Sequence, residues 1–392
     1  MTEQAQRLTM PADFKLETLA QYGELNQQHP NLKVRETYGH LNPSPMDIAT
    51  GRSANGLPEV KLDELAKYVG FGHRLGIGFN YTINAPCTGN LEFTSAGRLA
   101  LLRTVGQIMD TGITHFTLAN PALIQLLKGH FPQMEITVST IAQVDSAIAA
   151  KAFEDMGASR IVIAEDINRQ FYVQRMIKRL VKIPLEIIVN TRCFYSCPYR
   201  AQDYNLLSHL GNSKNAPDVR DYYKWICTGY LLSSPIEWLK MRWLRPEDLG
   251  LYKEITWFKV IGRHMVDRSD LARTARTWME GSFDGNLLEL LGNFSSDRTT
   301  LYPVRIDNKK LEGFTAWFAK NQWNCVEQGC DNCNHCERFL HKAVDPGSLQ
   351  GLQAHVDRYR TALTDANKYG KTRSLSSEDI LMETSSLMEE AR

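Results

Sequence analysis

The sequence predicts an α/β fold, a TIM-like βα barrel, and three observations lead to this class. Short runs rich in β-branched residues alternate with helical segments over most of the chain. At least six such strand–helix units follow one another. No Gly-x-Gly-x-x-Gly fingerprint follows the first predicted strand, which favours a closed barrel over a dinucleotide-binding sheet.

Length and composition agree with this class. The chain has 392 residues, of which 43% are hydrophobic and 23% charged, an ordinary globular composition. A formal net charge of +1 creates no global field that would attract nucleic acid or an anionic membrane. The N-terminus lacks the layout of a secretory signal, and no apolar run reaches the ~18 residues of a membrane span. We therefore expect a cytoplasmic protein with no membrane partner, whose thiols stay reduced.

The predicted elements divide the chain into four parts. Residues 1–70 are polar and broken by Pro and Gly, so we expect an N-terminal extension with one or two helices. Residues 71–300 form the predicted barrel, with strands at 74–83, 115–120, 134–140, 160–166, 185–193 and 257–263. Residues 301–343 form a cysteine-rich segment. Residues 344–392 are expected to be a helical tail whose Ser- and Glu-rich end is partly flexible.

The 8 cysteines fall into two groups and predict metal or redox chemistry. Cys87, Cys193 and Cys197 follow predicted strands, and Cys227 lies in the long connection before the last strand. Because the strand ends of a barrel converge on one face, these four thiols can meet although they are distant in sequence. A single buried cysteine is more often a small apolar core residue, and this alternative stays open for Cys87.

The second group lies in the stretch "NCVEQGCDNCNHC", with the spacing C-x4-C-x2-C-x2-C. It comprises Cys325, Cys330, Cys333 and Cys336. Two consecutive C-x2-C steps wrap a chain around one centre, as in ferredoxin-type loops. Structural zinc usually takes two separated pairs. The spacing favours a 4Fe–4S cluster, and zinc at this group remains the alternative. His335 could replace one of the thiolates.

Three blocks carry a resemblance to a known family: "VNTRCFYSCPYRAQDYN", "WLRPEDLGLYKEITWFKVIGR" and "SFDGNLLELL". Together with the terminal cysteine loop, they make the chain from about Arg74 to Arg338 resemble peptidase family U-32, the collagenase-like peptidases. The resemblance implies a βα barrel that holds a 4Fe–4S cluster on four cysteines and performs redox chemistry without O2. Better understood members serve oxygen-independent ubiquinone biosynthesis, in part as paired accessory proteins, and RNA-base hydroxylation.

The resemblance also implies roles for individual cysteines. Cys193 and Cys197 match a C-x3-C ligand pair, and Cys87 matches a ligand that follows an early strand. Cys227 as the fourth ligand is our own inference. The terminal loop is absent from the simplest members of the family, so we expect either one cluster or two.

Two other chemistries are disfavoured by missing motifs. No Gly-x-Ser-x-Gly elbow or His-Glu-x-x-His helix is present, and Ser208 and His209 are adjacent in sequence, which seldom gives the geometry of a catalytic dyad. Peptidase activity is therefore not expected. The radical S-adenosylmethionine motif C-x3-C-x2-C is also incomplete, because position 200 is Arg200 instead of cysteine.

Polar residues at the predicted strand ends are candidates for substrate chemistry. Ser139 and the Glu165–Asp166 pair end strands and, with Arg200, are the candidate catalytic residues. The alternative for Asp166 is a structural helix cap. Asn84 and Asn190 each precede a cysteine loop and are candidates to donate hydrogen bonds to cluster sulfurs.

Basic residues beside the strand ends predict an anionic small-molecule substrate, since guanidinium and ammonium groups bind carboxylates and phosphates. The candidates are Arg245, Lys259, Arg263 and His209. The alternative is that Arg245 and Arg263 form structural pairs with Glu247 and Asp248.

Three functions remain open from the sequence. The first is an iron–sulfur enzyme that, with an electron donor, performs hydroxylation-like redox chemistry on a small molecule or peptide of a biosynthetic pathway. The second is a non-catalytic accessory iron–sulfur protein that acts with a related partner subunit. The third is RNA-base hydroxylation, which the balanced charge and the lack of an evident RNA-binding module disfavour.

Overall fold

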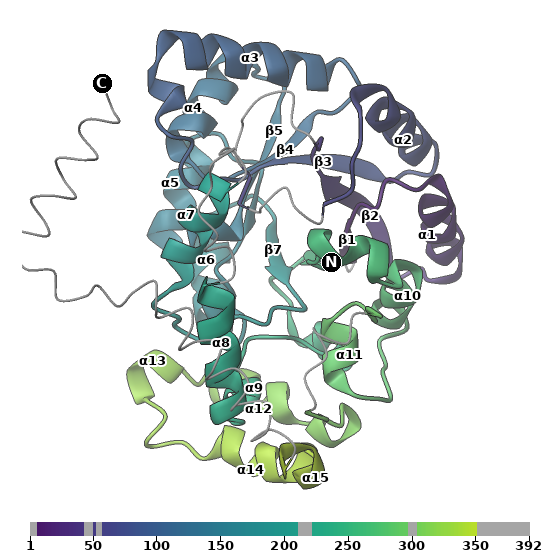
Figure 1. Ribbon diagram of the computed structural model, residues 1–392. Helices are drawn as coiled ribbons and strands as arrows, with labels where there is room; N and C mark the ends of the chain where they lie inside the picture. Colours follow the sequence, from purple (N-terminus) through teal and green to yellow (C-terminus); the bar gives the residue numbers. More distant parts are fainter. Residues whose placement is uncertain (1–5, 43–49, 52–56, 211–221, 297–303, 351–392) are drawn as a thin grey trace, which may run out of the picture.

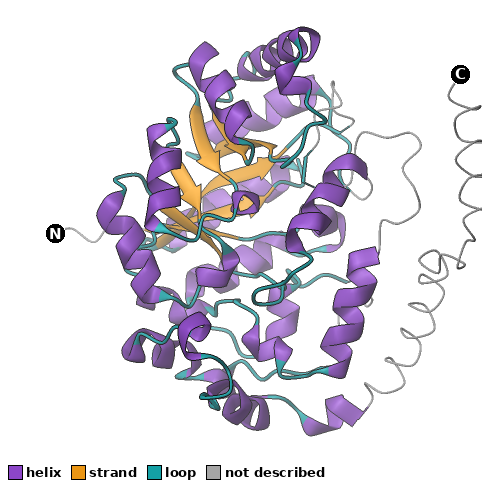
Figure 2. Cartoon of the chain, turned by 90° about the vertical axis from the view of Figure 1, so that its left-hand side faces the viewer, coloured by secondary structure: helices purple, strands orange, loops and turns teal. Residues whose placement is uncertain are grey.

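The computed structural model confirms the predicted barrel. Eight parallel strands close in the order β1-β2-β3-β4-β5-β6-β7-β8, and helices surround them (Figures 1 and 2). The structure describes residues 6–42, 50–51, 57–210, 222–296 and 304–350. Within these ranges, no helix is long and apolar enough to cross a lipid bilayer.

The strands are short, as is usual for this fold. They are β1 (Gln6–Pro11), β2 (Leu32–Gly39), β3 (Gly78–Ile83), β4 (His115–Leu118), β5 (Glu135–Val138), β6 (Arg160–Val162), β7 (Leu185–Ile188) and β8 (Trp257–Lys259). The helices of the outer ring are α1 (Leu16–Gln28), α2 (Leu62–Arg74), α3 (Ser95–Met109), α4 (Pro121–His130), α5 (Ala147–Asp155), α6 (Phe171–Leu180) and α10 (Leu271–Glu280).

Residues 6–39 correct the predicted domain boundaries. They were assigned to an N-terminal extension, but they supply β1, α1 and β2. β1 pairs with β2 on one side and with β8 on the other, where Leu8 faces Phe258, so this segment closes the barrel. The outward residues of β1, Leu8 and Met10, are fully buried beneath the helices, whereas its inward residue Thr9 is polar.

The interior of the barrel is polar and charged at its middle level. Arg160 donates from NH2 to both carboxylate oxygens of Glu36, at 2.6 and 2.7 Å. Its Nε lies 3.3 Å from Glu186 Oε2 and donates to Thr137 Oγ1 at 3.0 Å. Asn80 extends the network by donating to Glu36 Oε1 at 3.2 Å. These residues come from five different strands, so the network ties opposite walls of the barrel together.

Local sequence signals set the ends of the helices. Asn120 caps α4 by accepting from the backbone N–H of Ala122 at 2.9 Å, and Pro121 occupies the first helical position. Asp270 caps α10 by accepting from the N–H of Arg273 at 2.9 Å. Capping by Asn and Asp satisfies N–H groups that have no partner within the helix.

The remaining helices follow β7 and β8. They are α7 (Arg200–Leu210), α8 (Tyr222–Ser233), α9 (Glu237–Lys240), α11 (Leu287–Leu291), α12 (Phe314–Asn321), α13 (Cys325–Gln328), α14 (His335–Ala343) and α15 (Pro346–Gln350). The cysteine-rich segment carries α13 and α14, and α14 contacts α9 at the lower end of the molecule in Figure 1. The predicted helical tail begins as α15 and then leaves the described residues.

Candidate functional site

A cavity of ≈ 60 Å³ lies at the carboxyl ends of the strands, which is the face where barrel enzymes carry their active sites. Polar side chains from several strand ends line it, among them Tyr38, Thr82, Asn84, Ser139, Glu165, Lys259 and Arg263. We call this the mouth cavity. The structure therefore brings together five sequence-predicted residues and adds Tyr38 and Thr82, which the sequence analysis missed. Tyr38 lies two residues after Glu36 in β2, and Thr82 lies two residues after Asn80 in β3, so each pair points to the same side of its strand. This two-residue period was the signal by which the sequence could have identified both residues.

Lys259 is the most exceptional group in the mouth cavity. It is the last residue of β8 and is buried, and its ammonium has no hydrogen-bond partner among the residues that the structure describes. Its Nζ lies 4.0 Å from the centre of the Tyr38 ring. Burial lowers the pKa of Lys259 from its usual value, against the opposing effect of Glu186.

Arg263 reaches the mouth cavity through an unusual turn. Gly262 has φ +135°, and a Cβ at this position would come within 2.5 Å of the side-chain amide of Asn293, so a larger residue does not fit. Arg263 NH1 lies 2.9 Å from Nδ1 of the buried His40. Because the guanidinium is a donor, His40 Nδ1 accepts and the ring is neutral.

This contact predicts a pH-dependent stability. Burial, with a further contribution from Arg263, holds the pKa of His40 well below its usual range. Above about pH 6.5 the ring is neutral in both the folded and the unfolded protein, so it contributes no pH dependence to the free energy of unfolding. As the pH falls below that value, only the unfolded chain gains the proton, so stability falls. Between pH 7 and pH 5, we expect wild type to lose about 1–2 kcal/mol more than His40→Gln in urea titrations. Equal losses in both proteins would show that His40 is not held neutral.

Asn84 and Ser139 form one wall of the mouth cavity. Asn84 Nδ2 donates to Ser139 Oγ at 3.2 Å, and its Oδ1 accepts from the N–H of Gly51 at 3.1 Å. Asn84 thus lies beside Ser139, one of the candidate catalytic residues. Asn190 is used differently: its side chain bonds the backbone of Ile261 in both directions, at 2.9 and 2.8 Å, and joins the ends of β7 and β8. These contacts assign Asn190 a structural role.

Glu165 connects the mouth cavity with the first cysteine loop. It lies in a short 3-10 turn after β6, and its Oε2 accepts from Thr191 Oγ1 at 2.7 Å. Thr191 Oγ1 in turn accepts from the N–H of Cys193 at 3.3 Å. A chain of two hydrogen bonds therefore leads from a carboxylate of the cavity to the backbone of the cysteine loop.

Asp166 and Arg200 pair with each other. Arg200 donates to both carboxylate oxygens of Asp166, at 2.8 and 2.9 Å, and to the carbonyl of Phe194 at 2.5 Å. Asp166 also accepts from the N–H of Ser196 at 3.1 Å. The pair holds the loop 193–197 against the end of β6. Asp166 therefore anchors a loop, which differs from both the catalytic role and the helix-capping alternative considered from the sequence.

Three thiols of the first group lie near one another, Cys193 and Cys197 in the loop before α7 and Cys227 within α8. Cys197 and Cys227 form a hydrogen bond that lowers the pKa of Cys197 and raises that of Cys227. The backbone N–H groups of Tyr199 and Arg200 and the charge of Arg200 also favour the Cys197 thiolate. The charge of Cys193 acts on Cys227 as well. Of the hydrogen-bonded pair, Cys197 is therefore the thiol whose ionised form is favoured.

Cys87, the fourth thiol of the first group, is half-buried in the loop after β3. Across the described part of the chain, no three side chains of His, Cys, Asp or Glu converge closely enough to hold a single metal ion. The four-cysteine ligand set of the first group therefore stays a prediction.

The terminal thiols lie against buried cations. Cys325 and Cys336 pack on the hydrophobic core. Burial raises the pKa of Cys336 to about 11, and the charges of Arg169 and Arg242 oppose this shift. Arg242 in turn lies 3.7 Å from the ring of Tyr195, in the loop between Cys193 and Cys197. The two cysteine groups are therefore neighbours on this side of the barrel.

Three predicted residues lie outside the mouth cavity and outside the group Cys193, Cys197 and Cys227. Arg245 forms a bidentate pair with Asp248, at 2.9 and 2.8 Å, and donates to the carbonyl of Asn308 at 2.9 Å, so the structural alternative is correct for it. His209 is exposed near the end of α7. The ring of His335 is buried, stacks on Trp317 at 4.2 Å and places Nε2 3.0 Å from the carbonyl of Phe314, as a core histidine does.

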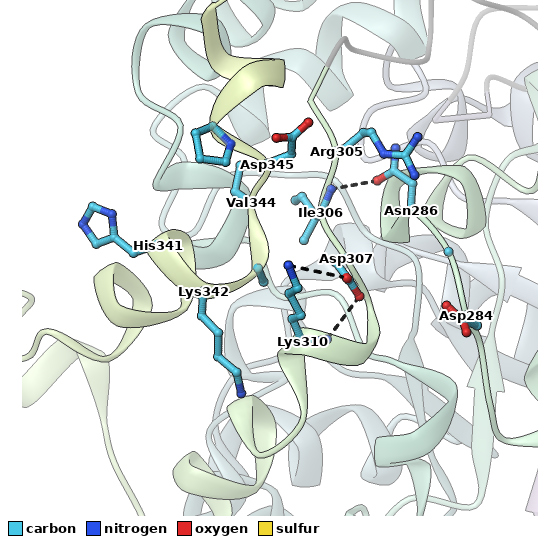
Figure 3. A pocket seen from close by; sticks show the side chains of 13 residues that line it. Asp284, Asn286, Arg305, Ile306, Asp307, Lys310, His341, Lys342, Val344 and Asp345 are labelled. Atoms are coloured by element: carbon cyan, nitrogen blue, oxygen red, sulfur yellow. Dashed lines mark hydrogen bonds and ion pairs between the residues drawn. The ribbon is translucent and has the colours of Figure 1, made fainter.

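A larger cavity of ≈ 310 Å³ lies on the C-terminal segment, and Figure 3 shows its lining. Acidic and basic side chains alternate around it, and Lys310 Nζ lies 4.0 Å from Asp307 Oδ2. Asn286 Oδ1 accepts from the N–H of Ile306 at 3.0 Å and holds its floor together. None of its lining residues belongs to a barrel strand or lines the mouth cavity, so its size does not make it the reaction site.

Comparison with known proteins assigns the family. The model of peptidase family U32 matches residues 52–265, more than half of the chain. The chain belongs to peptidase family U32. It is 30% identical over 341 residues to "Uncharacterized protease MJ1657" of Methanocaldococcus jannaschii, a match that covers 86% of this chain and 98% of that protein.

The chain is also more distantly similar to proteins named "tRNA hydroxylation protein P". The chain is 25% identical over 199 residues to "tRNA hydroxylation protein P" of Helicobacter pylori, covering 50% of this chain and 44% of that protein. It is 24% identical over 119 residues to the protein of that name from Escherichia coli, covering 30% and 24%. A solved structure, "The Structure of the U32 Peptidase Mk0906", aligns over 67% of this chain and 94% of its own, with a TM-score of 0.48 and 17% identity.

Proposed function

We propose that this chain is an iron–sulfur protein of the U32 family that carries out oxygen-independent, hydroxylation-related redox chemistry on a small molecule at the barrel mouth. Its family and its distant similarity to tRNA hydroxylation protein P support the type of reaction. The observation that carries the proposal is the group of three thiols, Cys193, Cys197 and Cys227, beside the guanidinium of Arg200.

The donor set of this thiol group suits an iron–sulfur cluster, because thiolates are the ligands of such clusters. Cys193 and Cys197 both lie close enough to Cys227 for their charges to act on it. Cys193, Cys197 and Cys227 would hold the cluster, with Cys87 as the predicted fourth ligand. Bound there, the cluster would supply electrons.

The protein's own residues would do the remaining work. Arg200 would stabilise the thiolates, because its charge acts on both Cys193 and Cys197. The hydrogen bonds from Cys193 through Thr191 to Glu165 would fix the cysteine loop relative to the mouth cavity. Glu165 would accept or donate a proton on a substrate in that cavity, because its carboxylate is among the lining groups.

RNA-base hydroxylation is the second candidate, because the named relatives in two organisms are tRNA hydroxylation proteins. The net charge of +1 and a mouth cavity of ≈ 60 Å³ favour a small molecule over a flipped base. An accessory role with a related partner subunit is the third. Turnover by the reduced protein alone, without a second subunit or RNA, would distinguish the enzyme from both.

The test is metal content after anaerobic purification. We expect about four irons and four sulfides per chain for one cluster, or about eight of each for two, with visible absorption from sulfide-to-iron charge transfer. Four irons with one zinc would assign the terminal thiols to zinc. Iron and sulfide at background level in wild type would overturn the proposal.

Cys197→Ala should remove one centre. We expect it to lose about four irons and four sulfides while any terminal centre stays bound. Ser208→Ala is the matched control, because it removes a buried hydroxyl from α7 that bonds only the carbonyl of Tyr204 among its described contacts. Unchanged iron in Cys197→Ala would exclude this thiol as a ligand, and loss of both centres would contradict independent sites.

A further inference from the structure

We propose that the mouth cavity is a carboxylate-binding site, with Lys259 as the group that holds the acid. The inference rests on the proposed function in one respect, since it makes a carboxylic acid the substrate of that chemistry. Binding itself requires no cluster, so it can be tested separately.

The first support is the unsatisfied ammonium. An ionised group buried without a partner is costly, and proteins normally pair it or leave it neutral. Lys259 is buried on an inward position of β8, and its Nζ has no hydrogen-bond partner within the described residues. The nearby carboxylates of Glu36 and Glu186 are already within ion-pair distance of Arg160. A bound anion would supply the hydrogen-bond partner that the described residues do not.

The second support is the arrangement of charge around the cavity. Lys259 and Arg263 line the same small space, and the charge of Arg263 acts unfavourably on that of Lys259. Two cations side by side are stabilised by an anion between them. Arg263 is held in place by His40, so this side chain is oriented before any ligand arrives.

The third support is a second unsatisfied group at the same place. The hydroxyl of Thr82 lines the mouth cavity, is buried, and has no hydrogen-bond partner among the described residues. It comes from β3, across the barrel from β8. Ser139, which also lines the cavity, accepts from Asn84. A ligand in the cavity therefore meets a cation on one side and a hydroxyl on another.

The cavity favours a carboxylate over a larger or more highly charged anion. Its ≈ 60 Å³ is far below the volume of a drug-sized ligand pocket and suits a planar acid group with few further atoms. Glu165 also lines it, and this carboxylate would repel the second negative charge of a phosphate. Glu165 could instead accept a hydrogen bond from a hydroxyl group next to the acid.

The test is binding of small acids to the full-length protein, measured by calorimetry at constant ionic strength. The probes are sodium acetate, glycolate and phosphate, with chloride as the reference salt. We expect acetate and glycolate to bind competitively with each other and more tightly than phosphate. No binding of either acid beyond that of chloride, or tighter binding of phosphate, would overturn the carboxylate assignment.

Variants identify the group that binds. Lys259→Met should weaken the binding of both acids at least about tenfold, because a charge-assisted hydrogen bond is lost. Lys259→Arg, which keeps a cation, should recover part of this loss. Lys67→Met removes a lysine that is 74% exposed on α2 and should change nothing. Affinity unchanged in Lys259→Met would overturn the role of Lys259.

Two measurements keep the outcome interpretable. Thermal unfolding of each variant shows whether it folds. If Lys259→Met does not fold, the comparison between wild type and Lys259→Arg decides. Equal affinity of these two proteins for both acids would count against a specific ammonium contact. Iron and sulfide content shows whether the proposed function fails independently. Acid binding with no iron would support this inference and refute the iron–sulfur proposal, and iron without acid binding would do the reverse.

Discussion

Arg160→Met is expected to lower the free energy of unfolding by about 3–5 kcal/mol, the range found when one partner of a buried ion pair is removed. Arg160 contacts both Glu36 and Glu186, at 2.6 and 3.3 Å, and no other cation within the described residues forms an ion pair with both. Both carboxylates are almost fully buried, and both oxygens of Glu186 lack a hydrogen bond within the described residues. Methionine has a similar volume, so the loss reflects stranded charge more than an empty space.

Urea unfolding at neutral pH measures this loss. Arg7→Met is the control, because Arg7 also lies over Trp257, at 5.1 Å, but is only half-buried at the rim of the barrel; a loss below about 1 kcal/mol is expected. Adding Glu36→Gln to Arg160→Met should recover part of the stability, since one stranded carboxylate is removed. A loss below 1 kcal/mol in Arg160→Met would mean that the carboxylates take up protons or find other partners.

The same polar interior explains why the first two strands escaped prediction. Strands such as β6 and β7 read as nearly continuous apolar runs, "RIVIAED" and "LEIIVN", because their outward faces are covered by helices. β2 reads "LKVRETYG", with charged residues at three of its positions. Glu36 points into the barrel and pairs with Arg160, which lies 124 residues further along the chain. No local pattern shows such a partner, so the segment resembled a polar extension.

The mouth cavity was partly predictable for a geometric reason. Ser139, Glu165 and Lys259 stand at or just after strand ends, and in a barrel all strand ends meet on one face. Asn190 and Arg245 stand beside strand ends too, but each has partners that satisfy it: the backbone of Ile261 for Asn190, and Asp248 for Arg245. The sequence shows position along the chain, whereas only the structure shows which polar groups still lack a partner.

Arg169→Leu is expected to release the terminal thiol segment from the barrel and to cost about 2–4 kcal/mol. Arg169 is fully buried and donates to the carbonyls of Leu239 and Trp243, at 2.7 and 3.1 Å. Its guanidinium also lies 4.7 Å from the ring of Phe314 in α12. One side chain thus joins the turn after β6, the chain around α9 and the helix that precedes the cysteines.

Two effects oppose each other in this variant. Leucine removes a buried charge, whose burial lowers the pKa of Arg169 to about 10, and that removal is favourable. It also strands two buried carbonyls, at about 1–3 kcal/mol each, and loses the contacts with the aromatic rings. We expect the second effect to prevail, because the lost bonds span three segments of the chain and leucine cannot replace any of them.

Thiol labelling of the metal-free protein gives the local readout. In Arg169→Leu, iodoacetamide should modify the half-buried Cys325 and Cys336 several-fold faster than in wild type, as peptide mapping would show. Arg338→Leu is the control, because Arg338 lies in the same helix as Cys336 but bonds only the ring of His335 at 3.3 Å among its described side-chain contacts. If both variants label at the wild-type rate, the terminal segment is held by its apolar contacts alone, and Arg169 serves the barrel rather than the cysteines.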